Sequence, residues 1–360
     1  MPANPTPQRL TQMFKQRRAR GDHAPKAHTG EIAPNHHTQT RNPHQAPWAS
    51  AKKTRIGLYV ITLCLSCLST ISTSQAATIK VGPKHAIKLP SQAATLVQAG
   101  DIVEIEAGIY PGDAAVWRAD NLTLRGVNGR ARLLSQGITV GGKGIWVIKG
   151  RNTTVENIEF ANAKVPDRNG AGIRQEGANL TVRNCLFREN ENGILSGANP
   201  ESEITIESSE FDHNGQGDGR SHNIYIGAIR KFTLRNSTTQ RARIGHQIKS
   251  RAIINIIENN IIQDSPTGHS SYLIDLPSGG TAIIKGNTLH QGKYAENYTM
   301  LAYGAEKMLH KENSISIIDN KFSNDRRAGC RAIWIKPSNV KPELKNNQFI
   351  DCKQIMNNEG

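Results

Sequence analysis

Residues 179–187 read NLTVRNCLF, and imperfect copies of this stretch return along most of the chain. The copies are NTTVENIEF (152–160), EITIESSEF (203–211), KFTLRNSTT (231–239), NIIENNII (255–262), TAIIKGNTL (281–289), SISIIDNKF (314–322) and PELKNNQF (342–349). Their last residues lie 23 to 33 positions apart. A repeat of roughly 20–50 residues is typical of a solenoid, a propeller or a repeat array. One structural unit has therefore been copied along the chain.

Within a unit, apolar residues alternate with polar ones, as at Leu180 and Val182, which is the periodicity of a strand. An Asn often stands two places beyond the second apolar residue. These residues are Asn157, Asn184, Asn236, Asn259 and Asn346. Asn tolerates the left-handed backbone of a tight turn. We expect short strands joined by Asn turns, with the Asn side chains of stacked units aligned in a ladder.

The length of the repeat distinguishes a β-helix from the other repeat folds. A propeller blade needs four strands and roughly 40–45 residues, and leucine-rich repeats need a regular Leu consensus that is missing here. The sequence therefore predicts an all-β fold, a single right-handed parallel β-helix of about ten coils with an N-terminal cap. The repeat also resembles the ILV-x-ILV-x-N-x-x-F unit of the parallel β-helix repeat proteins of the pectate-lyase-like superfamily, over residues 78–352. That resemblance implies the fold and assigns no reaction.

The first 76 residues do not fit the repeat. Residues 1–51 are rich in Pro, Gln, Arg, Asn and His without apolar periodicity, which predicts a disordered extension or a start site placed too early. Residues 52–76 combine a basic start, a short apolar run and small residues up to Ala76, in the order of a secretory signal peptide. We expect cleavage after Ala76, a β-helix domain over 77–360, and a secreted or periplasmic protein.

The apolar run at residues 56–68 is shorter than the ~20 residues that a spanning helix needs, so we expect no stable membrane insertion after cleavage. A lipoprotein site at Cys67 is the weaker alternative, because Cys64 stands where a Leu is usual.

The net charge indicates which class of binding partner suits the protein. The full chain carries +15, but residues 1–76 hold ten Lys or Arg and two Asp or Glu, which leaves +7 on the mature chain. An exported basic protein suits an acidic polysaccharide. No aromatic-stacking motif or dense basic helix points to nucleic acid. We expect a monomer.

No cofactor and no metal is predicted. The one candidate is calcium, through oxygen ligands in the segment Asp212-His213-Asn214 and Asp218, but the spacing matches no strong motif and a polar turn is the preferred interpretation.

Three cysteines follow Ala76. Cys185 lies on a predicted core strand, where a buried inert thiol is expected. Cys330 and Cys352 lie about one coil apart, so stacking could pair them; the sequence leaves this open.

An open β-helix end would expose apolar core and unpaired strand edges. Residues 78–100 lack the repeat and predict a cap, with a short amphipathic helix from Ser91 to Ala99 ended by Gly100. Asp101 to Ile109 would form the first strands of the coil stack.

Five longer insertions fall between the last apolar position of a repeat and the next strand. They cover residues 164–170, 214–221, 264–271, 293–298 and 324–329. They should emerge from one side of the solenoid, which is how repeat proteins build a binding face.

A second short strand follows each insertion, with a central apolar residue that we expect to point inward. These residues are Ile173, Ile194, Ile224, Ile248, Ile274, Ala302 and Ile333. Side chains alternate along a strand, so the next residue should point outward. The predicted outward column is Arg174, Leu195, Tyr225, Lys249, Asp275, Tyr303 and Trp334.

Further polar residues flank this column on neighbouring coils. They are His222, Asn223, His246, Gln247, Arg251 and Tyr272. Aromatic rings offer flat faces to sugar rings, and Lys, Arg and His attract carboxylates and move protons. We predict catalytic roles for His246, Lys249, Tyr225, His222 and Arg251. The predicted substrate-binding residues are Asn223, Gln247, Tyr272, Asp275, Tyr303, Arg174 and Trp334. A structural role for each single residue stays open, including a plain ion pair between Lys249 and Asp275.

Uronate β-elimination needs a cation for the substrate carboxylate, a base for the proton beside it and a donor for the leaving oxygen. Lys249 or Arg251 suits the first role, His246 or deprotonated Lys249 the second, and Tyr225 or Tyr303 the third. C5-epimerisation uses the same groups, so the sequence does not separate the two reactions. A non-catalytic glycan-binding or envelope-assembly protein is the alternative. Glycoside hydrolysis ranks third, because it wants two carboxylates and the column offers Asp275 with a remote Glu306.

Overall fold

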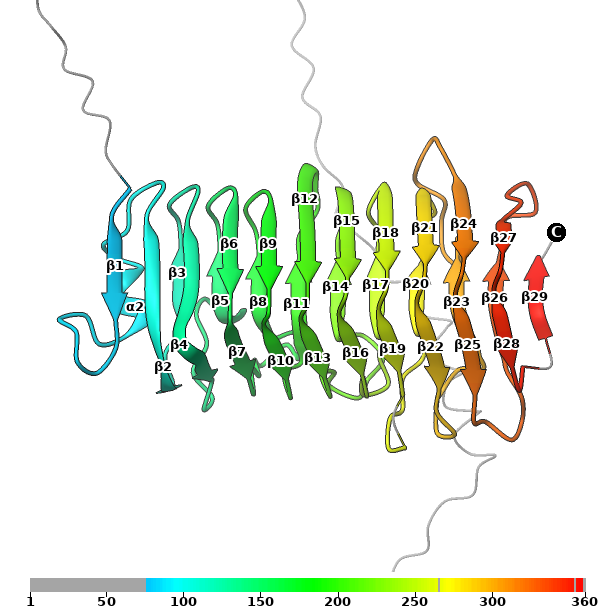
Figure 1. Cartoon of the computed structure of the whole chain (residues 1–360), viewed down its shortest axis with the longest axis horizontal. Coiled ribbons are helices and arrows are strands. Elements are labelled where there is room, and N and C mark those ends of the chain that lie inside the picture. Colours follow the sequence, from blue (N-terminus) through cyan, green and yellow to red (C-terminus); the bar gives the residue numbers. More distant parts are fainter. Residues whose placement is uncertain (1–75, 265, 353, 359–360) are drawn as a thin grey trace, which may run out of the picture. The chain divides into compact units, whose positions relative to one another are not determined.

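The computed structural model describes residues 76–264, 266–352 and 354–358. The extension at 1–51 and all but the last residue of the predicted signal peptide at 52–76 lie outside these residues. In the described part, no helix is long and apolar enough to cross a membrane. The repeat region forms a stack of coils whose strands pair only in parallel, each strand with its counterparts in the coils before and after (Figure 1).

Each complete coil supplies three strands, which we assign to row 1, row 2 and row 3 in chain order. Row 1 contains β1 (Thr78–Val81), β2 (Ile102–Pro111), β4 (Thr123–Leu134), β6 (Thr153–Glu156), β9 (Leu180–Arg183), β12 (Asn199–Glu207), β15 (Ile229–Arg235), β18 (Ile254–Glu258), β21 (Thr281–Lys285), β24 (Ser314–Ile318) and β27 (Glu343–Lys345). Row 2 contains β7 (Ile158–Ala161), β10 (Leu186–Arg188), β13 (Glu210–Asp212), β16 (Thr238–Gln240), β19 (Ile261–Gln263), β22 (Thr288–Gln291), β25 (Lys321–Asn324) and β28 (Gln348–Ile350). Row 3 contains β3 (Ala115–Trp117), β5 (Gly144–Ile148), β8 (Ala171–Gln175), β11 (Asn192–Ser196), β14 (Ile224–Ile226), β17 (Ile248–Ser250), β20 (Ile274–Leu276), β23 (Thr299–Tyr303), β26 (Arg331–Ile335) and β29 (Gln354–Asn358).

Rows 1 and 2 belong to one sheet because β2 and β4 run through both, and row 3 forms a second sheet of ten described strands. The predicted all-β parallel β-helix of about ten coils is therefore confirmed.

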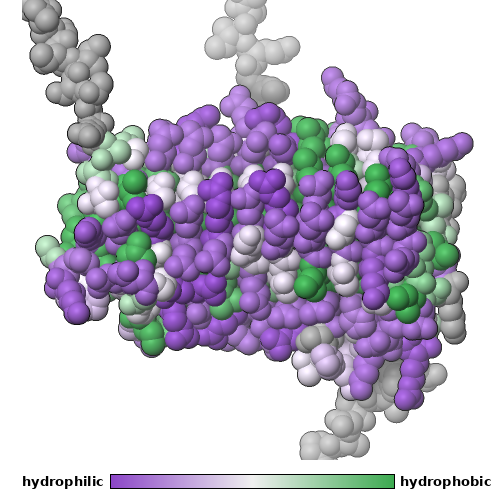
Figure 2. Space-filling model, viewed as in Figure 1, coloured by the Kyte–Doolittle hydropathy of each residue, from purple (hydrophilic) through white to green (hydrophobic). Residues whose placement is uncertain are grey.

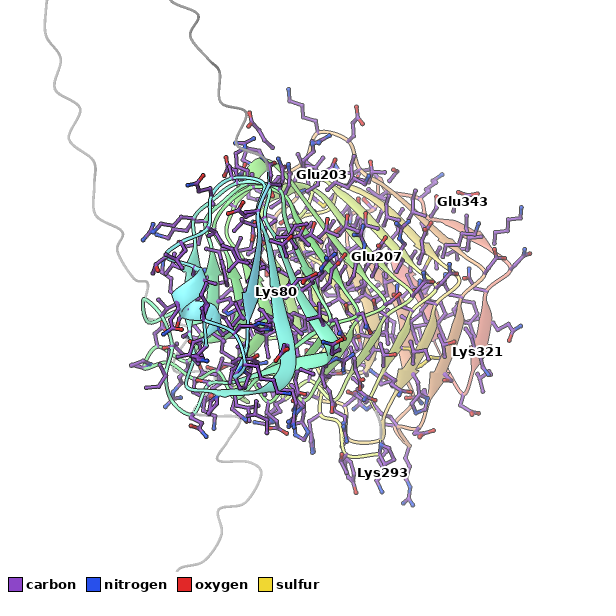
Figure 3. All side chains as sticks on the ribbon, turned by 60° about the vertical axis from the view of Figure 1, so that its left-hand side comes forward. Lys80, Glu203, Glu207, Lys293, Lys321 and Glu343 are labelled. Carbon is purple, nitrogen blue, oxygen red and sulfur yellow. A yellow bond between two sulfur atoms is a disulfide. The ribbon has the colours of Figure 1, made fainter. Side chains whose placement is uncertain are left out.

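The core is a set of columns in which like residues stack. Val182, Ile206 and Leu234 occupy one register position in successive coils of row 1 and are fully buried. In row 2, Phe160, Phe187 and Phe211 stack with ring centroids 5.0 and 4.7 Å apart. The labelled Lys and Glu side chains instead lie on the outside of the coils (Figure 3), and the face in Figure 2 is mostly hydrophilic with small separate apolar patches.

The Asn turns join row 1 to row 2. All five predicted turn residues adopt positive φ, with Asn184 at 49° and Asn259 at 56° as examples. The predicted ladder is present at these positions only in part, because Asn184 donates to Asn157 but most of the others face solvent. The longer ladder lies one residue later, where the side chain points inward.

This inner ladder consists of Asn260, Asn287, Asn320 and Asn347, whose amides bond at 2.9 to 3.1 Å. The amide oxygens of Asn287, Asn320 and Asn347 also accept the backbone N–H of the preceding coil's Asn, as from Asn260 to Asn287. A left-handed turn residue directs its own side chain outward, so the next side chain satisfies the buried backbone.

The cap helix is shorter than predicted. Helix α2 covers Pro90–Ala93 and begins after Leu89, not at Ser91. The Gln92 side chain accepts the N–H groups of Lys88 and Leu89, which places the helix start one residue earlier. The role of this segment as a cap stays a prediction.

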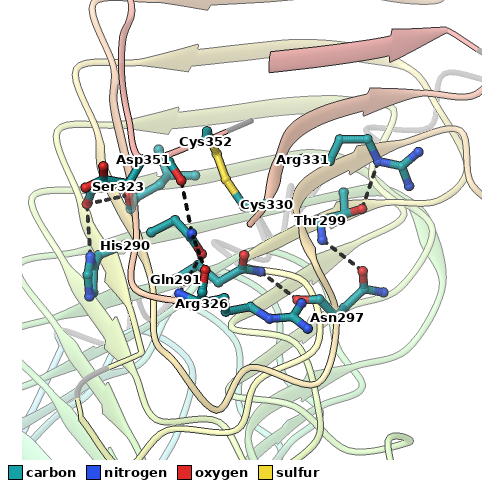
Figure 4. Close-up of a disulfide and its surroundings, with 12 residues drawn as sticks. His290, Gln291, Asn297, Thr299, Ser323, Arg326, Cys330, Arg331, Asp351 and Cys352 are labelled. Atoms are coloured by element: carbon teal, nitrogen blue, oxygen red, sulfur yellow. Dashed lines mark hydrogen bonds between the residues drawn. A yellow bond between two sulfur atoms is a disulfide. The ribbon is translucent and has the colours of Figure 1, made fainter. Parts of the chain in front are cut away.

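Cys330 and Cys352 form a disulfide between stacked turns, with Cα atoms 5.0 Å apart (Figure 4). Cys185 is a buried free thiol, and desolvation raises its pKa to about 12, which agrees with the inert role expected from the sequence.

Candidate functional site

The five insertions predicted from the sequence all lie between row 2 and row 3, so they border the same edge of row 3. Row 3 itself carries the candidate site. Tyr225 on β14, Lys249 on β17 and Asp275 on β20 occupy one register position in three successive coils. Leu195 on β11 and Arg174 on β8 continue this column toward the N-terminus. The predicted outward column is confirmed over these five coils.

The column departs from the prediction one coil later. Ala302 pairs with Asp275, and Trp334 pairs with Ala302, so Tyr303 is not in the column. Tyr303 points into the core, is fully buried and donates its hydroxyl to the Gly280 carbonyl at 2.5 Å. The predicted substrate contact is therefore wrong for Tyr303. Ala302 fits either face of a strand, so the sequence offered no signal for the correct phase.

A row of stacked rings borders the column. His222 stacks on Tyr225 with centroids 5.6 Å apart and on His246 at 4.7 Å, and His246 meets Tyr272 at 5.1 Å. Both histidines are buried, at 2 % and 7 % exposure. These four rings come from three successive coils, as the sequence predicted.

The hydrogen bonds of the two histidines define their protonation. Nδ1 of His222 accepts the backbone N–H of His246 at 2.9 Å, and Nδ1 of His246 accepts that of Tyr272 at 3.1 Å. A backbone amide is always the donor, so each Nδ1 is unprotonated and each neutral ring carries its proton on Nε2. Desolvation by burial, with a smaller contribution from Lys249, lowers the pKa of His222 to about 3 and that of His246 well below its usual range.

Neither nitrogen of either neutral ring is then free to accept a substrate proton. The role of base predicted for His246 does not fit this arrangement, and a proton-transfer role as the catalytic function predicted for His222 does not fit it either. His246 instead directs Nε2 toward Asp275, 3.4 Å from Oδ2.

Asp275 is the centre of the cluster. Nζ of Lys249 lies 3.1 Å from its Oδ2, while its Oδ1 has no hydrogen-bond partner among the described residues. The residue is 2 % exposed, and desolvation raises its pKa to about 6 against the opposing effect of Lys249. A buried carboxylate with a raised pKa and a free oxygen is suited to accept and return a proton near neutral pH. The sequence had predicted a substrate-binding role for Asp275 and, in the third-ranked hydrolase, the role of one of two carboxylates.

The cations form a second layer around Asp275. Lys249 also contacts Glu306 Oε1 at 3.0 Å, and Arg251 contacts Glu306 Oε2 at 2.8 Å. Arg251 donates further to the Tyr225 hydroxyl at 3.2 Å and to Ser278 at 3.3 Å. Burial opposes protonation of Lys249, but Asp275 and Glu306 outweigh it and raise its pKa. Lys249 is therefore a cation here, which removes the alternative that it acts as the base.

Of the remaining members, the sequence predicted Glu306 only as a remote second carboxylate and did not predict Ser278. Glu306 lies in the connection after β23, 57 positions from Lys249, and no periodic signal marks it. Its approach to the cluster depends on the fold alone.

Asn223 and Gln247 do not face the site. Both are fully buried, and Asn223 donates to Gln247 at 2.5 Å while Gln247 donates to Asp264 at 3.0 Å. Asn223 also accepts from Asn214 at 2.8 Å. The predicted substrate contacts of Asn223 and Gln247 are wrong, because these side chains point inward and satisfy a buried polar column.

A groove of about 500 Å³ lies beside the N-terminal part of the column. Arg174 and Tyr225 line it from the strands, and Arg168 and Arg220 line it from the insertions at 164–170 and 214–221. These two insertions therefore build a concave face. On the C-terminal side, the Arg331 guanidinium lies 4.7 Å from the centroids of both Trp334 and Tyr298.

The segment weighed for calcium is occupied by protein contacts. Arg241 holds the Asp212 carboxylate at 2.7 Å, Asp218 accepts the Arg220 N–H at 3.0 Å, and Asn214 lies in the buried column. Within residues 76–264, 266–352 and 354–358, no group of three or more His, Cys, Asp or Glu side chains is placed to hold a metal.

Comparison with known proteins agrees with the β-helix fold. The sequence matches the family model "Right handed beta helix region" over residues 107–238. The chain is a right-handed parallel β-helix protein. This family model agrees with the parallel β-helix that the structure shows. No curated protein matches it significantly by sequence.

Several solved structures share this β-helix. An alginate lyase from Paenibacillus sp. str. FPU-7 superposes with a TM-score of 0.61 at 13% identity, covering 79% of this chain and 98% of that one. The A-module of the mannuronan C-5 epimerase AlgE4 from Azotobacter vinelandii gives 0.47 at 12% identity, covering 74% and 91%. Pectate lyase Pel9A gives 0.47 at 12% identity, covering 74% and 78%.

Proposed function

We propose that this β-helix protein acts on an acidic polysaccharide and removes the proton beside a uronate carboxylate, leading to β-elimination or C5-epimerisation. The observation that carries the proposal is Asp275, a buried carboxylate that has one oxygen without a hydrogen-bond partner among the described residues and a pKa of about 6. Such a group next to two cations is a typical acid–base centre.

The described contacts suggest a role for each neighbour. Lys249 and Arg251 neutralise the substrate carboxylate and so stabilise the negative charge that develops when the proton leaves. Asp275 Oδ1 takes the C5 proton, and the electron pair forms the C4–C5 double bond. Tyr225 accepts a hydrogen bond from Arg251, so its own hydroxyl proton is available to the departing O4. In epimerisation the C4–O4 bond stays, and a proton returns to C5 from the opposite face.

Two further observations support an acidic sugar polymer. The groove beside Tyr225 is lined by three cations, Arg168, Arg174 and Arg220, against two carboxylates, Asp167 and Asp218, and this excess of cations suits carboxylates spaced along a chain. The alginate lyase that shares the fold acts, by its name, on such a polymer.

A glycan-binding protein without catalysis is the second candidate. It is favoured by the burial of Asp275, whose side chain is only 3 % exposed, so that reaction requires Glu306 or a neighbour to move. Glycoside hydrolysis remains the third candidate, because it needs two carboxylates. Asp275 and Glu306 both contact Lys249, but Glu306 is already paired with two cations.

We further propose that the protein is secreted or periplasmic. The disulfide between Cys330 and Cys352 supports an oxidising compartment, in agreement with the predicted signal peptide at 52–76. Amino-terminal sequencing of the exported protein should begin near Ala77, and recovery of the intact N-terminus in the cytosol would contradict this proposal.

One experiment separates the reactions. The exported protein and its Asp275→Asn variant are incubated with alginate, polygalacturonate and a neutral glucan in D₂O. Elimination produces an ultraviolet-absorbing unsaturated uronate, and epimerisation introduces deuterium at C5 without chain cleavage. Binding without either signal supports the glycan-binding candidate, and new reducing ends without unsaturation support the hydrolase. Full activity of Asp275→Asn would show that the base lies elsewhere.

A further inference from the structure

The ion pair between Glu306 and the two cations of the site has an unusual distribution of exposure. Lys249 and Arg251 have side chains that are 12 % and 22 % exposed, whereas Glu306 is 48 % exposed. The cations therefore belong to the wall of the solenoid, and the carboxylate reaches them from the solvent side.

The cations are held independently of Glu306. Lys249 keeps its contact with Asp275, and Arg251 is positioned by Tyr225 and Ser278. Glu306 lies in the connection between β23 and β24, which rests on the backbone of the turn after β20 through the N–H of Glu306 to Pro277 at 3.1 Å. The cation pair is the fixed partner and Glu306 is the movable one.

Both oxygens of the Glu306 carboxylate are engaged by the cations. Oε1 lies 3.0 Å from both Lys249 Nζ and Arg251 Nη2, and Oε2 lies 2.8 Å from Arg251 Nη2. This is the geometry of charge-assisted hydrogen bonds to one carboxylate from two different side chains. Any planar carboxylate brought to the same place would find the same two donors.

We propose that Lys249 and Arg251 form a binding site for the carboxylate of a uronic acid residue, and that Glu306 occupies this site in the free protein and is displaced by the substrate. This inference rests on the proposed function for the identity of the ligand, but it concerns binding and not the proton transfer at Asp275.

The displacement has a consequence for specificity. If Glu306 leaves and no anion replaces it, Arg251 keeps only the neutral partners Tyr225 and Ser278, and a partly buried cation without a counter-ion is costly. A neutral sugar cannot compensate for this loss, whereas a uronate can. Glu306 therefore acts as an internal competitor that makes binding depend on a substrate carboxylate.

The test compares Glu306→Gln with the matched control Glu312→Gln, which removes an exposed charge from the same connection. The probes are the tetrasaccharides of mannuronate and galacturonate, with neutral mannotetraose as the reference, titrated in a calorimeter. Loss of an exposed competing ion pair should tighten uronate binding by about 1.4- to fivefold, the range that such pairs supply. Glu312→Gln should bind as the parent does. Unchanged or weaker binding by Glu306→Gln would overturn the proposal.

A second measurement uses the unaltered protein, in case the variant folds poorly. Leu309 donates its backbone N–H to Ser278 at 3.0 Å and Glu306 donates to Pro277, so displacement of the connection should release both. Uronate binding should therefore speed hydrogen exchange at residues 306 and 309, although ligands usually slow exchange. Slower or unchanged exchange in the complex would contradict displacement.

The two proposals fail in different ways. Tighter uronate binding by Glu306→Gln without elimination or deuterium at C5 would remove the proposed reaction and leave the carboxylate site. Catalysis with no change of affinity in Glu306→Gln would remove Glu306 as a competitor and leave the reaction.

Discussion

Replacement of His222 by Asn tests the central claim about the buried rings, that they are neutral. The Asn side chain offers an oxygen acceptor close to the position of Nδ1, so the N–H of His246 keeps a partner, but Asn does not titrate. The variant should lose some packing against Tyr225 at every pH. The informative quantity is the change in its free energy of unfolding between pH 7 and pH 5.

The expected magnitude follows from the pKa of His222, which is about 3 in the folded protein against 6.5 for an ordinary His. Above pH 6.5 the ring is neutral in both states and its contribution to stability is fully present. Below pH 6.5 the unfolded chain binds a proton that the folded chain excludes, so stability falls at about 1.4 kcal/mol per pH unit. Between pH 7 and pH 5 the loss from His222 is about 2 kcal/mol.

Asp275 changes stability in the opposite direction, which is why the variant and not the parent alone must be measured. Its pKa is raised to about 6, so the folded state binds the proton first and regains stability as the pH falls from 6 toward 3.8. This contribution is common to the parent and to His222→Asn, and it cancels in the difference.

The assay is urea unfolding followed by circular dichroism at pH 7 and pH 5, on the parent, His222→Asn and the exposed control His269→Asn. His222→Asn should lose about 2 kcal/mol less than the parent between the two pH values, and His269→Asn should follow the parent. Equal losses in all three proteins would show that His222 is not a neutral buried ring, and the tautomer argument against a histidine base would fail with it.

Asp275→Asn should lower turnover on the polyuronate that the parent converts by ~10²-fold or more, with binding retained. The parent's rate should fall as the pH drops below about 6, because a protonated Asp275 takes no proton. A flat pH–rate profile would contradict this role. Tyr225→Phe should reduce turnover and leave the melting temperature nearly unchanged. Tyr303→Phe should instead cost ~1–2 kcal/mol of stability and leave turnover unchanged. Thermal melts and rates that show the reverse pattern would restore Tyr303 to the site. Asn287→Leu should cost about 3 kcal/mol in urea unfolding, because it leaves the buried N–H and side-chain amide of Asn260 without their acceptor; a neutral effect would mean that the inner Asn ladder does not contribute to stability.

Much of the fold was predictable because its signals are local. Alternation at positions such as Leu180 and Val182 and an Asn at many of the tight turns depend only on neighbouring residues, and their recurrence along the coils defined the β-helix. The column from Arg174 to Asp275 followed from the same alternation. The prediction failed at Tyr303. Ala302 has no preference for either face of a strand, and only its pairing with Asp275 shows that Ala302, and not Tyr303, belongs to the column.

The chemistry of the site was decided by tertiary contacts. The sequence predicted that His246, Lys249 and Asp275 would gather on adjacent coils, but which of them holds a proton depends on burial and on partners from other coils. A backbone N–H from the next coil fixes the His246 tautomer, desolvation raises the pKa of Asp275, and Glu306 arrives from 57 positions away. Connections between rows have no periodicity, so no pattern in the chain locates Glu306. Residue types and their order determine which groups can meet, and the packed coils determine their charge.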